Sequence, residues 1–159
     1  MSGVPRRWVA GLLGAMSLVL GGCGTFPADP DGTLDRVQGG VLRVGVSPSP
    51  PWTVVGAGDP AGIEPDLVRR FADGLQAQVT WQVGGEEMLI GELEHHRLDL
   101  VVGGLTEDSP WTDKAAITKP YTEGPDPAGK PVGRVMAAPM GENAFLLRLE
   151  KFLLEEASR

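Results

Sequence analysis

The chain has 159 residues, of which 42% are hydrophobic and 22% are charged, and its formal net charge is −7. These values are typical of a folded globular domain and exclude a disordered tail, a collagen-like repeat or a membrane bundle. The acidic balance argues against a nucleic-acid partner, because phosphate binding needs clustered Lys and Arg side chains. The single cysteine excludes an intramolecular disulfide, and the sequence has no Cys or His spacing that is typical of a zinc site.

Residues 1–22 have the features of a signal peptide. Arg6 and Arg7 precede an apolar stretch over residues 8–20, which is too short to span a bilayer comfortably. The sequence Leu-Gly-Gly-Cys that ends at Cys23 resembles the lipobox of bacterial lipoproteins. This resemblance implies lipidation of Cys23 and a location in the bacterial cell envelope, anchored to the membrane on its periplasmic or extracytoplasmic face. The alternative is an apolar export signal with an incidental cysteine.

Residues 23–40 are rich in Gly, Pro and Asp, which predicts a flexible tether between the lipid and a folded lobe over residues 41–159. The lobe begins with a strand over residues 41–46, and the prolines that follow end this strand because proline lacks an N–H donor. A helix then begins near Pro65, since proline suits the first turn and the acids beside it suit the positive end of the helix dipole. Its apolar face comprises Leu67, Val68, Phe71 and Leu75.

Three further elements follow this helix. Apolar residues alternate with polar ones from Val79 to Val83, which predicts a strand. The apolar residues Leu89, Ile90 and Leu93 predict a short helix over residues 86–95. Residues 98–102 form a compact apolar run that ends in two glycines, as expected for a buried parallel strand.

The last part of the chain begins with a predicted linker, residues 122–131, followed by a strand over residues 134–138. A final helix has Asn143 as its expected N-cap. The apolar residues of this helix recur at helical spacing: Phe145, Leu146, Leu149, Phe152 and Leu153. The order of elements predicts an α/β fold, a single lobe with a mostly parallel β-sheet and helices on both faces.

In an open parallel sheet, ligands bind beyond the carboxyl ends of the strands. This rule selects the loops over residues 47–52, 84–87 and 103–111 as candidate site loops. Trp52 and Trp111 lie in two of them. Aromatic walls beside flexible glycines and hydroxyl groups suit a small polar organic ligand. In the alternative interpretation, both tryptophans cover the edge of the hydrophobic core.

Five segments carry a family resemblance by their order and spacing: LRVGV at 42–46, PW at 51–52, GIEPDL at 62–67, LDLVVGGLT at 98–106 and KPY at 119–121. Together they resemble the first lobe of family 3 extracellular solute-binding proteins, the lipid-tethered receptors of polar amino-acid ABC importers. Residues 135–154 are similar to the segment with which that family returns to its first lobe. The resemblance implies half of a type II periplasmic binding protein without enzymatic activity, cofactor or metal. Its ligand-binding residues would be Trp52, Gly104, Leu105, Thr106 and Trp111.

The sequence departs from the family pattern in two places. A typical member continues from its hinge into a second lobe, whereas residues 122–131 stand in that place here and are too few to form a domain. The family also commonly places an arginine five residues after the threonine that matches Thr106, where its two parallel N–H groups bind the ligand carboxylate. This position holds Trp111. Thr106 and the backbone of Gly104 remain as the expected donors to a ligand.

Other chemistry-bearing residues give weaker signals. His95 and His96 are adjacent, so their side chains point in different directions on a helix and do not chelate one ion well. The acid pairs at 86–87 and 107–108 have no nucleophile or third group to support acid–base catalysis. Ser109 has no partners that are evident from the sequence.

Two hypotheses from different classes follow. The first is a substrate-binding component linked to an ABC permease, which binds a small polar, amino-acid-like solute weakly because half of the usual cleft is missing. Two copies facing each other as a homodimer would rebuild that cleft. The second is a protein-interaction module that has lost small-molecule binding and contacts a membrane sensor or permease through the surface that a second lobe would have covered.

Overall fold

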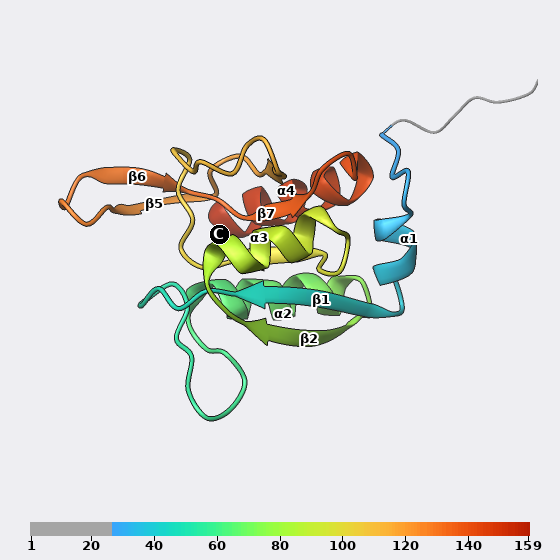
Figure 1. Cartoon of the computed structure of the whole chain (residues 1–159), viewed down its shortest axis with the longest axis horizontal. Helices are drawn as coiled ribbons and strands as arrows, with labels where there is room; N and C mark the ends of the chain where they lie inside the picture. Colours follow the sequence, from blue (N-terminus) through green and yellow to red (C-terminus); the bar gives the residue numbers. More distant parts are fainter. Residues whose placement is uncertain (1–26) are drawn as a thin grey trace, which may run out of the picture.

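The computed structural model describes residues 27–159 (Figure 1). The predicted signal peptide and Cys23 lie outside these residues. In chain order the elements are α1 (Thr33–Val37), β1 (Val41–Val46), α2 (Ile63–Gly74), β2 (Gln78–Val83), α3 (Glu86–Glu94), β3 (Leu100–Val102), β4 (Ala115–Ile117), β5 (Thr122–Pro125), β6 (Pro131–Arg134), β7 (Ala137–Pro139) and α4 (Asn143–Ala157). Within the described residues, no helix has the length and apolar character needed to cross a membrane.

A five-stranded sheet with the order β2-β1-β3-β7-β4 forms the centre of the lobe. Strand β1 pairs in parallel with β2 and β3, whereas β7 runs antiparallel to both β3 and β4. The α/β prediction is therefore confirmed, and the sheet is mixed rather than mostly parallel. Strand β4 was not predicted, because its three residues, Ala115–Ile117, are too few to show a periodic pattern.

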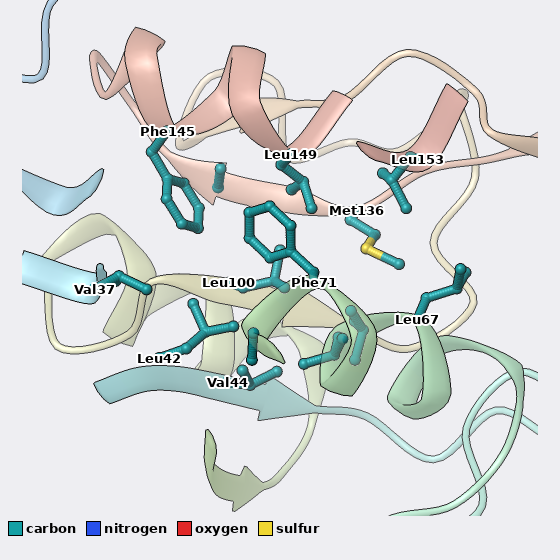
Figure 2. Packing of buried hydrophobic residues seen from close by; sticks show 14 of the residues in the cluster. Val37, Leu42, Val44, Leu67, Phe71, Leu100, Met136, Phe145, Leu149 and Leu153 are labelled. Carbon is teal, nitrogen blue, oxygen red and sulfur yellow. The ribbon is translucent and has the colours of Figure 1, made fainter. Parts of the chain in front are cut away.

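The larger core lies between one face of the sheet and the helices α1, α2 and α4. Alternate residues of β1, Leu42, Val44 and Val46, face this core and are fully buried. Figure 2 shows Phe71 of α2 directed towards Phe145 of α4, and the ring centroids lie 5.8 Å apart in an edge-to-face arrangement. The predicted apolar faces of α2 and α4 are thus the faces that pack on the sheet.

The opposite face of the sheet is covered by α3 (Figure 1). Leu89, Ile90 and Leu93 of this helix are fully buried in a second cluster, together with Val101 of β3. Its neighbours Leu100 and Val102 belong to the larger core, so β3 is buried on both faces, as its continuous apolar sequence predicts.

Residues 27–40 correct the predicted flexible tether. They include helix α1, and Val37 at the end of this helix is fully buried in the larger core. The backbone N–H groups of Asp31 and Thr33 donate to the carboxylate of Glu142, at 3.0 and 2.8 Å. These contacts join residues more than a hundred positions apart, which is why composition alone suggested a tether.

The N-terminus of α4 is capped by Asp29 and not by Asn143, which corrects a second prediction. One carboxylate oxygen of Asp29 accepts hydrogen bonds from the N–H groups of Ala144 and Phe145, at 2.6 and 3.1 Å. Asn143 is exposed, and the residue before the helix makes no side-chain cap. The cap therefore comes from the segment that precedes α1.

The predicted linker over residues 122–131 and the predicted strand over residues 134–138 are also rearranged. Residues 122–134 form a β-hairpin in which β5 pairs antiparallel with β6, and the chain then enters β7. Asp126 closes the turn by accepting from the N–H groups of Ala128 and Lys130, both at 2.8 Å. The hairpin projects from the body of the lobe (Figure 1).

Candidate functional site

A cavity of about 260 Å³, the loop cavity, lies at the carboxyl edge of the sheet. The loops that follow β1 and β3 and the turn of the hairpin form its walls. This is the position in which open α/β sheets bind ligands. The lining residues are Ser49, Glu86, Gly103, Gly104, Leu105, Thr106, Asp108, Ser109, Pro110, Pro127 and Arg134.

Glu64 of α2 holds the loop that forms the floor of this cavity. One of its carboxylate oxygens accepts hydrogen bonds from the N–H groups of Gly103 and Gly104, both at 2.8 Å. The other oxygen accepts from the hydroxyl of Tyr121 at 2.7 Å, which ties the loop to the residue that precedes β5. The side chain is fully buried, and this burial raises the pKa of Glu64 although its hydrogen bonds and the nearby Arg134 oppose the shift.

Gly104 must be glycine for two reasons. Its φ of 65° lies in the left-handed region, and a Cβ at this position would lie 2.5 Å from the Ser49 hydroxyl oxygen. Its N–H donates to Glu64, and its carbonyl oxygen accepts from Nη1 of Arg134 at 2.6 Å. The expectation that the Gly104 backbone donates to a ligand is therefore corrected, because Glu64 already occupies this N–H group.

Two cavity residues, Pro127 and Arg134, lie outside the predicted site loops, and Arg134 at the end of β6 is the charged one. The side chain is 6% exposed, and its guanidinium lies over the Trp52 ring, 4.7 Å from the ring centroid. Its Nη2 donates to the carbonyl of Pro125 across the hairpin. The only signal in the sequence was a charged residue at the start of an apolar run, and the hairpin that brings it to the cavity was expected to be a linker.

The two tryptophans lie in the predicted loops but do not line the loop cavity. Trp52 is 9% exposed and lies beneath Arg134. Trp111 packs against the second core cluster, and its indole N–H donates to the carboxylate of Glu86 at 3.2 Å. Each tryptophan thus supports a charged residue that does line the cavity.

Leu105 and Thr106, two of the residues expected to bind a ligand, line the loop cavity. Leu105 is also buried in the second core cluster, so part of its side chain serves packing. Thr106 forms an isolated antiparallel bridge with Arg134, which aligns the loop with the hairpin. At the other side of this bridge, the carboxylate of Glu107 accepts a hydrogen bond from the N–H of Gly133 at 3.0 Å.

A second and larger cavity, of about 530 Å³, lies beside Tyr121. Trp52 belongs to the lining of this cavity. Exposed Ile63 at the start of α2 and Leu153 near the end of α4 give it an apolar wall. Arg70 and Glu156 form an ion pair at 2.5 Å on its rim.

One α/β lobe with a candidate site beyond the carboxyl ends of its parallel strands is the architecture of one half of a type II periplasmic binding protein. The profile of the bacterial extracellular solute-binding proteins, family 3, matches residues 42–134, more than half of the chain. The chain belongs to this family.

Solved structures show the same fold. The arginine-bound form of domain 1 from TmArgBP superposes with a TM-score of 0.66 at 22% identity, over 76% of this chain and 97% of that one. An ancestral cationic amino-acid solute-binding protein gives a TM-score of 0.69 at 14% identity, over 79% of this chain and 94% of that one. An arginine-specific periplasmic binding protein of Salmonella typhimurium gives 0.64 at 12% identity, over 75% and 94% of the two chains.

A curated relative has a different description. The chain is 30% identical over 97 residues to the membrane-bound lytic murein transglycosylase F of Vibrio cholerae. The match covers 60% of this chain but only 18% of the relative, so the chain spans less than a fifth of that enzyme's length.

Proposed function

We propose that the chain is an envelope lipoprotein that serves as the substrate-binding component of an ABC importer and binds a small polar, amino-acid-like solute in the loop cavity. The observation that carries this proposal is the position of the cavity at the carboxyl edge of the sheet, walled by the loops after β1 and β3. Membership of the solute-binding family supports it. Domain 1 of TmArgBP, described in an arginine-bound form, supports binding by a single lobe of this size.

A solute in this cavity would be less enclosed than one between two lobes. The hairpin covers one side, since Pro127 and Arg134 both line the cavity, but no second domain closes over it within the described residues. We therefore expect modest affinity, which a permease or a second copy of the lobe would raise by covering the open side. A permease in this position would also receive the solute.

The proposal is tested by a thermal-shift screen of the protein, purified in a non-ionic detergent, against amino acids, small peptides, polyamines and organic acids. A ligand at about a hundred times its dissociation constant adds about 2.7 kcal/mol to the free energy of unfolding. This corresponds to a shift of about 5 °C or more for a domain of this size. Thr106→Ala, in the cavity wall, should abolish the shift, whereas the control Thr80→Ala, exposed on β2, should keep it.

Lipidation of Cys23 is a separate part of the proposal, supported by the lipobox-like sequence that precedes it. Mass spectrometry of the purified protein should find a diacylglyceryl group on an N-terminal Cys23. Replacing it in Cys23→Ser should release the protein from the membrane fraction. An unmodified cysteine with an intact preceding sequence contradicts this part and leaves the solute-binding part standing.

Binding without catalysis is also proposed, because the matched family is described by solute binding and the transglycosylase match covers a small part of that enzyme. Incubation with purified peptidoglycan should release no soluble fragments. Release of such fragments by the purified chain would contradict the proposal.

A second candidate function is a protein-interaction module that no longer binds small molecules. It is favoured by one observation: the N–H groups of Gly103 and Gly104 already donate to Glu64. The larger cavity beside Tyr121, with exposed Ile63 in its wall, would then contact a membrane sensor or permease. A cooperative melt with no hit in the screen, together with a crosslink from Ile63→Cys to such a protein, would favour this function over solute binding.

A further inference from the structure

Arg134 is a buried cation that has no acidic partner in the part of the chain that the structure describes. It is 6% exposed, yet no carboxylate among residues 27–159 forms an ion pair with it. Burying a charge is unfavourable unless it is paired, so buried arginines are ordinarily matched with an anion. Glu64 exerts an electrostatic influence on this site but spends its hydrogen bonds on Gly103, Gly104 and Tyr121.

The guanidinium also has donors to spare. An arginine carries five N–H groups. In the structure, Nη1 donates to the Gly104 carbonyl at 2.6 Å and Nη2 donates to the Pro125 carbonyl. The buried Nε has no hydrogen-bond partner among the described residues. With Trp52 against one face of the group, its orientation is fixed, and within residues 27–159 each terminal nitrogen uses only one of its two N–H groups.

Arg134 lines the loop cavity together with further groups that suit a ligand with both charges. The hydroxyl of Ser109 is buried in the cavity wall and has no partner among residues 27–159. The carboxylates of Glu86 and Asp108 belong to the same wall. A cavity of about 260 Å³ that contains an unpaired guanidinium and two acids fits a small zwitterion, with its carboxylate at the arginine.

We propose that Arg134 is the carboxylate-binding residue of the loop cavity, and that the solute therefore carries a carboxylate. This inference rests on the proposed function of the cavity as a solute site. Arg134 belongs to the hairpin and not to the loop after β3, where Trp111 stands. The hairpin is thus part of the site, because it delivers the cation that holds the anion.

The first test observes the Arg134 side chain directly. Acetate is titrated into the 15N-labelled protein, purified in detergent, while the Nε–Hε signals of its arginines are recorded by NMR. The Arg134 signal, assigned by its loss in Arg134→Lys, should shift saturably with acetate and stay unchanged with equal concentrations of methylammonium chloride. The signal of Arg69, which stacks on Trp81 away from the cavity, serves as the internal control and should not move.

The second test compares L-arginine with agmatine, which differs from it by the absence of the carboxylate. The wild-type protein should bind L-arginine at least tenfold more tightly than agmatine. Arg134→Gln should remove this preference, and the matched variant Arg69→Gln should keep it. If Arg134 had only a structural role, Arg134→Gln would weaken the binding of both compounds alike and leave the ratio of their dissociation constants unchanged.

The outcomes separate this inference from the proposed function. If amino acids bind but acetate leaves Arg134 unmoved and the arginine preference survives in Arg134→Gln, the inference is overturned and the proposed function stands. If acetate shifts Arg134 while no amino acid binds, the inference stands and the proposed function fails. If neither acetate nor any amino acid binds, both are overturned.

Discussion

At the amino edge of the sheet Asp99 accepts hydrogen bonds from two arginines, whereas at the carboxyl edge Glu64 accepts hydrogen bonds only from neutral groups. Both carboxylates are fully buried. Oδ1 of Asp99 forms ion pairs with Nη2 of Arg36 at 2.5 Å and with Nη2 of Arg43 at 2.6 Å. Burial alone would raise the pKa of Asp99, but the bonds from Arg43 and Arg36 outweigh it and hold this pKa below 3.8. For Glu64, burial prevails and its pKa is raised.

This difference separates an edge whose buried charges are matched from the edge at which we propose that the solute binds. The charges of Asp99, Arg36 and Arg43 are matched among themselves, and together they fasten α1 to the sheet. At the other edge the buried cation, Arg134, lies beside the loop cavity, and the buried anion, Glu64, positions backbone instead of pairing with it. Among the described residues, Arg134 at the carboxyl edge therefore forms no ion pair, and it lies beside the cavity in which we propose that the solute binds.

The largest expected effect is at the amino edge. Asp99→Asn removes the charge from both ion pairs, and we expect it to lower the free energy of unfolding by about 3 kcal/mol, the low end for breaking a buried pair because both arginines reach solvent. Urea unfolding followed by circular dichroism measures this change. Glu92→Gln, which breaks the exposed pair between Glu92 and Arg97, is the control and should cost far less. Equal losses in the two variants would show that the amino edge is not specially stabilised.

The two carboxylates should also respond to pH with opposite signs. Glu64 has a raised pKa in the folded state, so stability falls as the pH rises from the ordinary value of 4.5 through the folded pKa. Asp99 has a lowered pKa, so its contribution is present above 3.8 and is lost as the pH falls through the folded pKa. Urea unfolding measured as a function of pH should show two changes in the free energy of unfolding. The fall with rising pH above 4.5 should disappear in Glu64→Gln, and the loss with falling pH below 3.8 should disappear in Asp99→Asn. A wild-type slope above pH 4.5 that persists in Glu64→Gln contradicts the assignment.

A smaller effect is expected where the hairpin meets Trp52. A Cβ at Gly124 would collide with the Trp52 ring and would lie 3.1 Å from Nε of Arg134. Gly124→Ala should therefore destabilise the protein by about 2 kcal/mol through overpacking. It should also alter the near-ultraviolet circular dichroism of the tryptophans. The control Gly58→Ala has open space around its Cβ and should change neither quantity. An unchanged spectrum in Gly124→Ala would mean that the hairpin does not hold Trp52 in place.

The sequence predicted the elements whose signals are local. The strand over residues 41–46 and the helix over residues 86–95 follow from apolar spacing, and the structure places them at Val41–Val46 and Glu86–Glu94. The candidate loops after β1 and β3 follow from the rule that ligands bind at the carboxyl ends of strands, and both contribute to the loop cavity.

Contacts between distant parts of the chain could not be predicted in this way. The hairpin that carries Arg134 contains Pro125 and Pro131, and prolines beside a charged turn are typical of a linker. The role of Glu64 depends on Gly103, Gly104 and Tyr121, which follow it by about forty to sixty positions. Local patterns carry no information about such partners, so the site residues with the strongest electrostatic roles were the ones missed.

The smallest expected effect tests one such distant contact at the amino edge. Asp29→Ala removes the carboxylate that caps α4, and we expect it to lower the free energy of unfolding by about 1 kcal/mol, the usual cost of losing an N-cap. Asn143→Ala is the matched variant: it alters the residue that local sequence favours as the cap, and stability should stay unchanged because Asn143 is exposed and the Ala144 and Phe145 N–H groups donate to Asp29 instead. Both are measured by urea unfolding. The reverse order of effects would return the cap to Asn143 and detach residues 27–32 from the stable part of the lobe, because Asp29 joins them to α4.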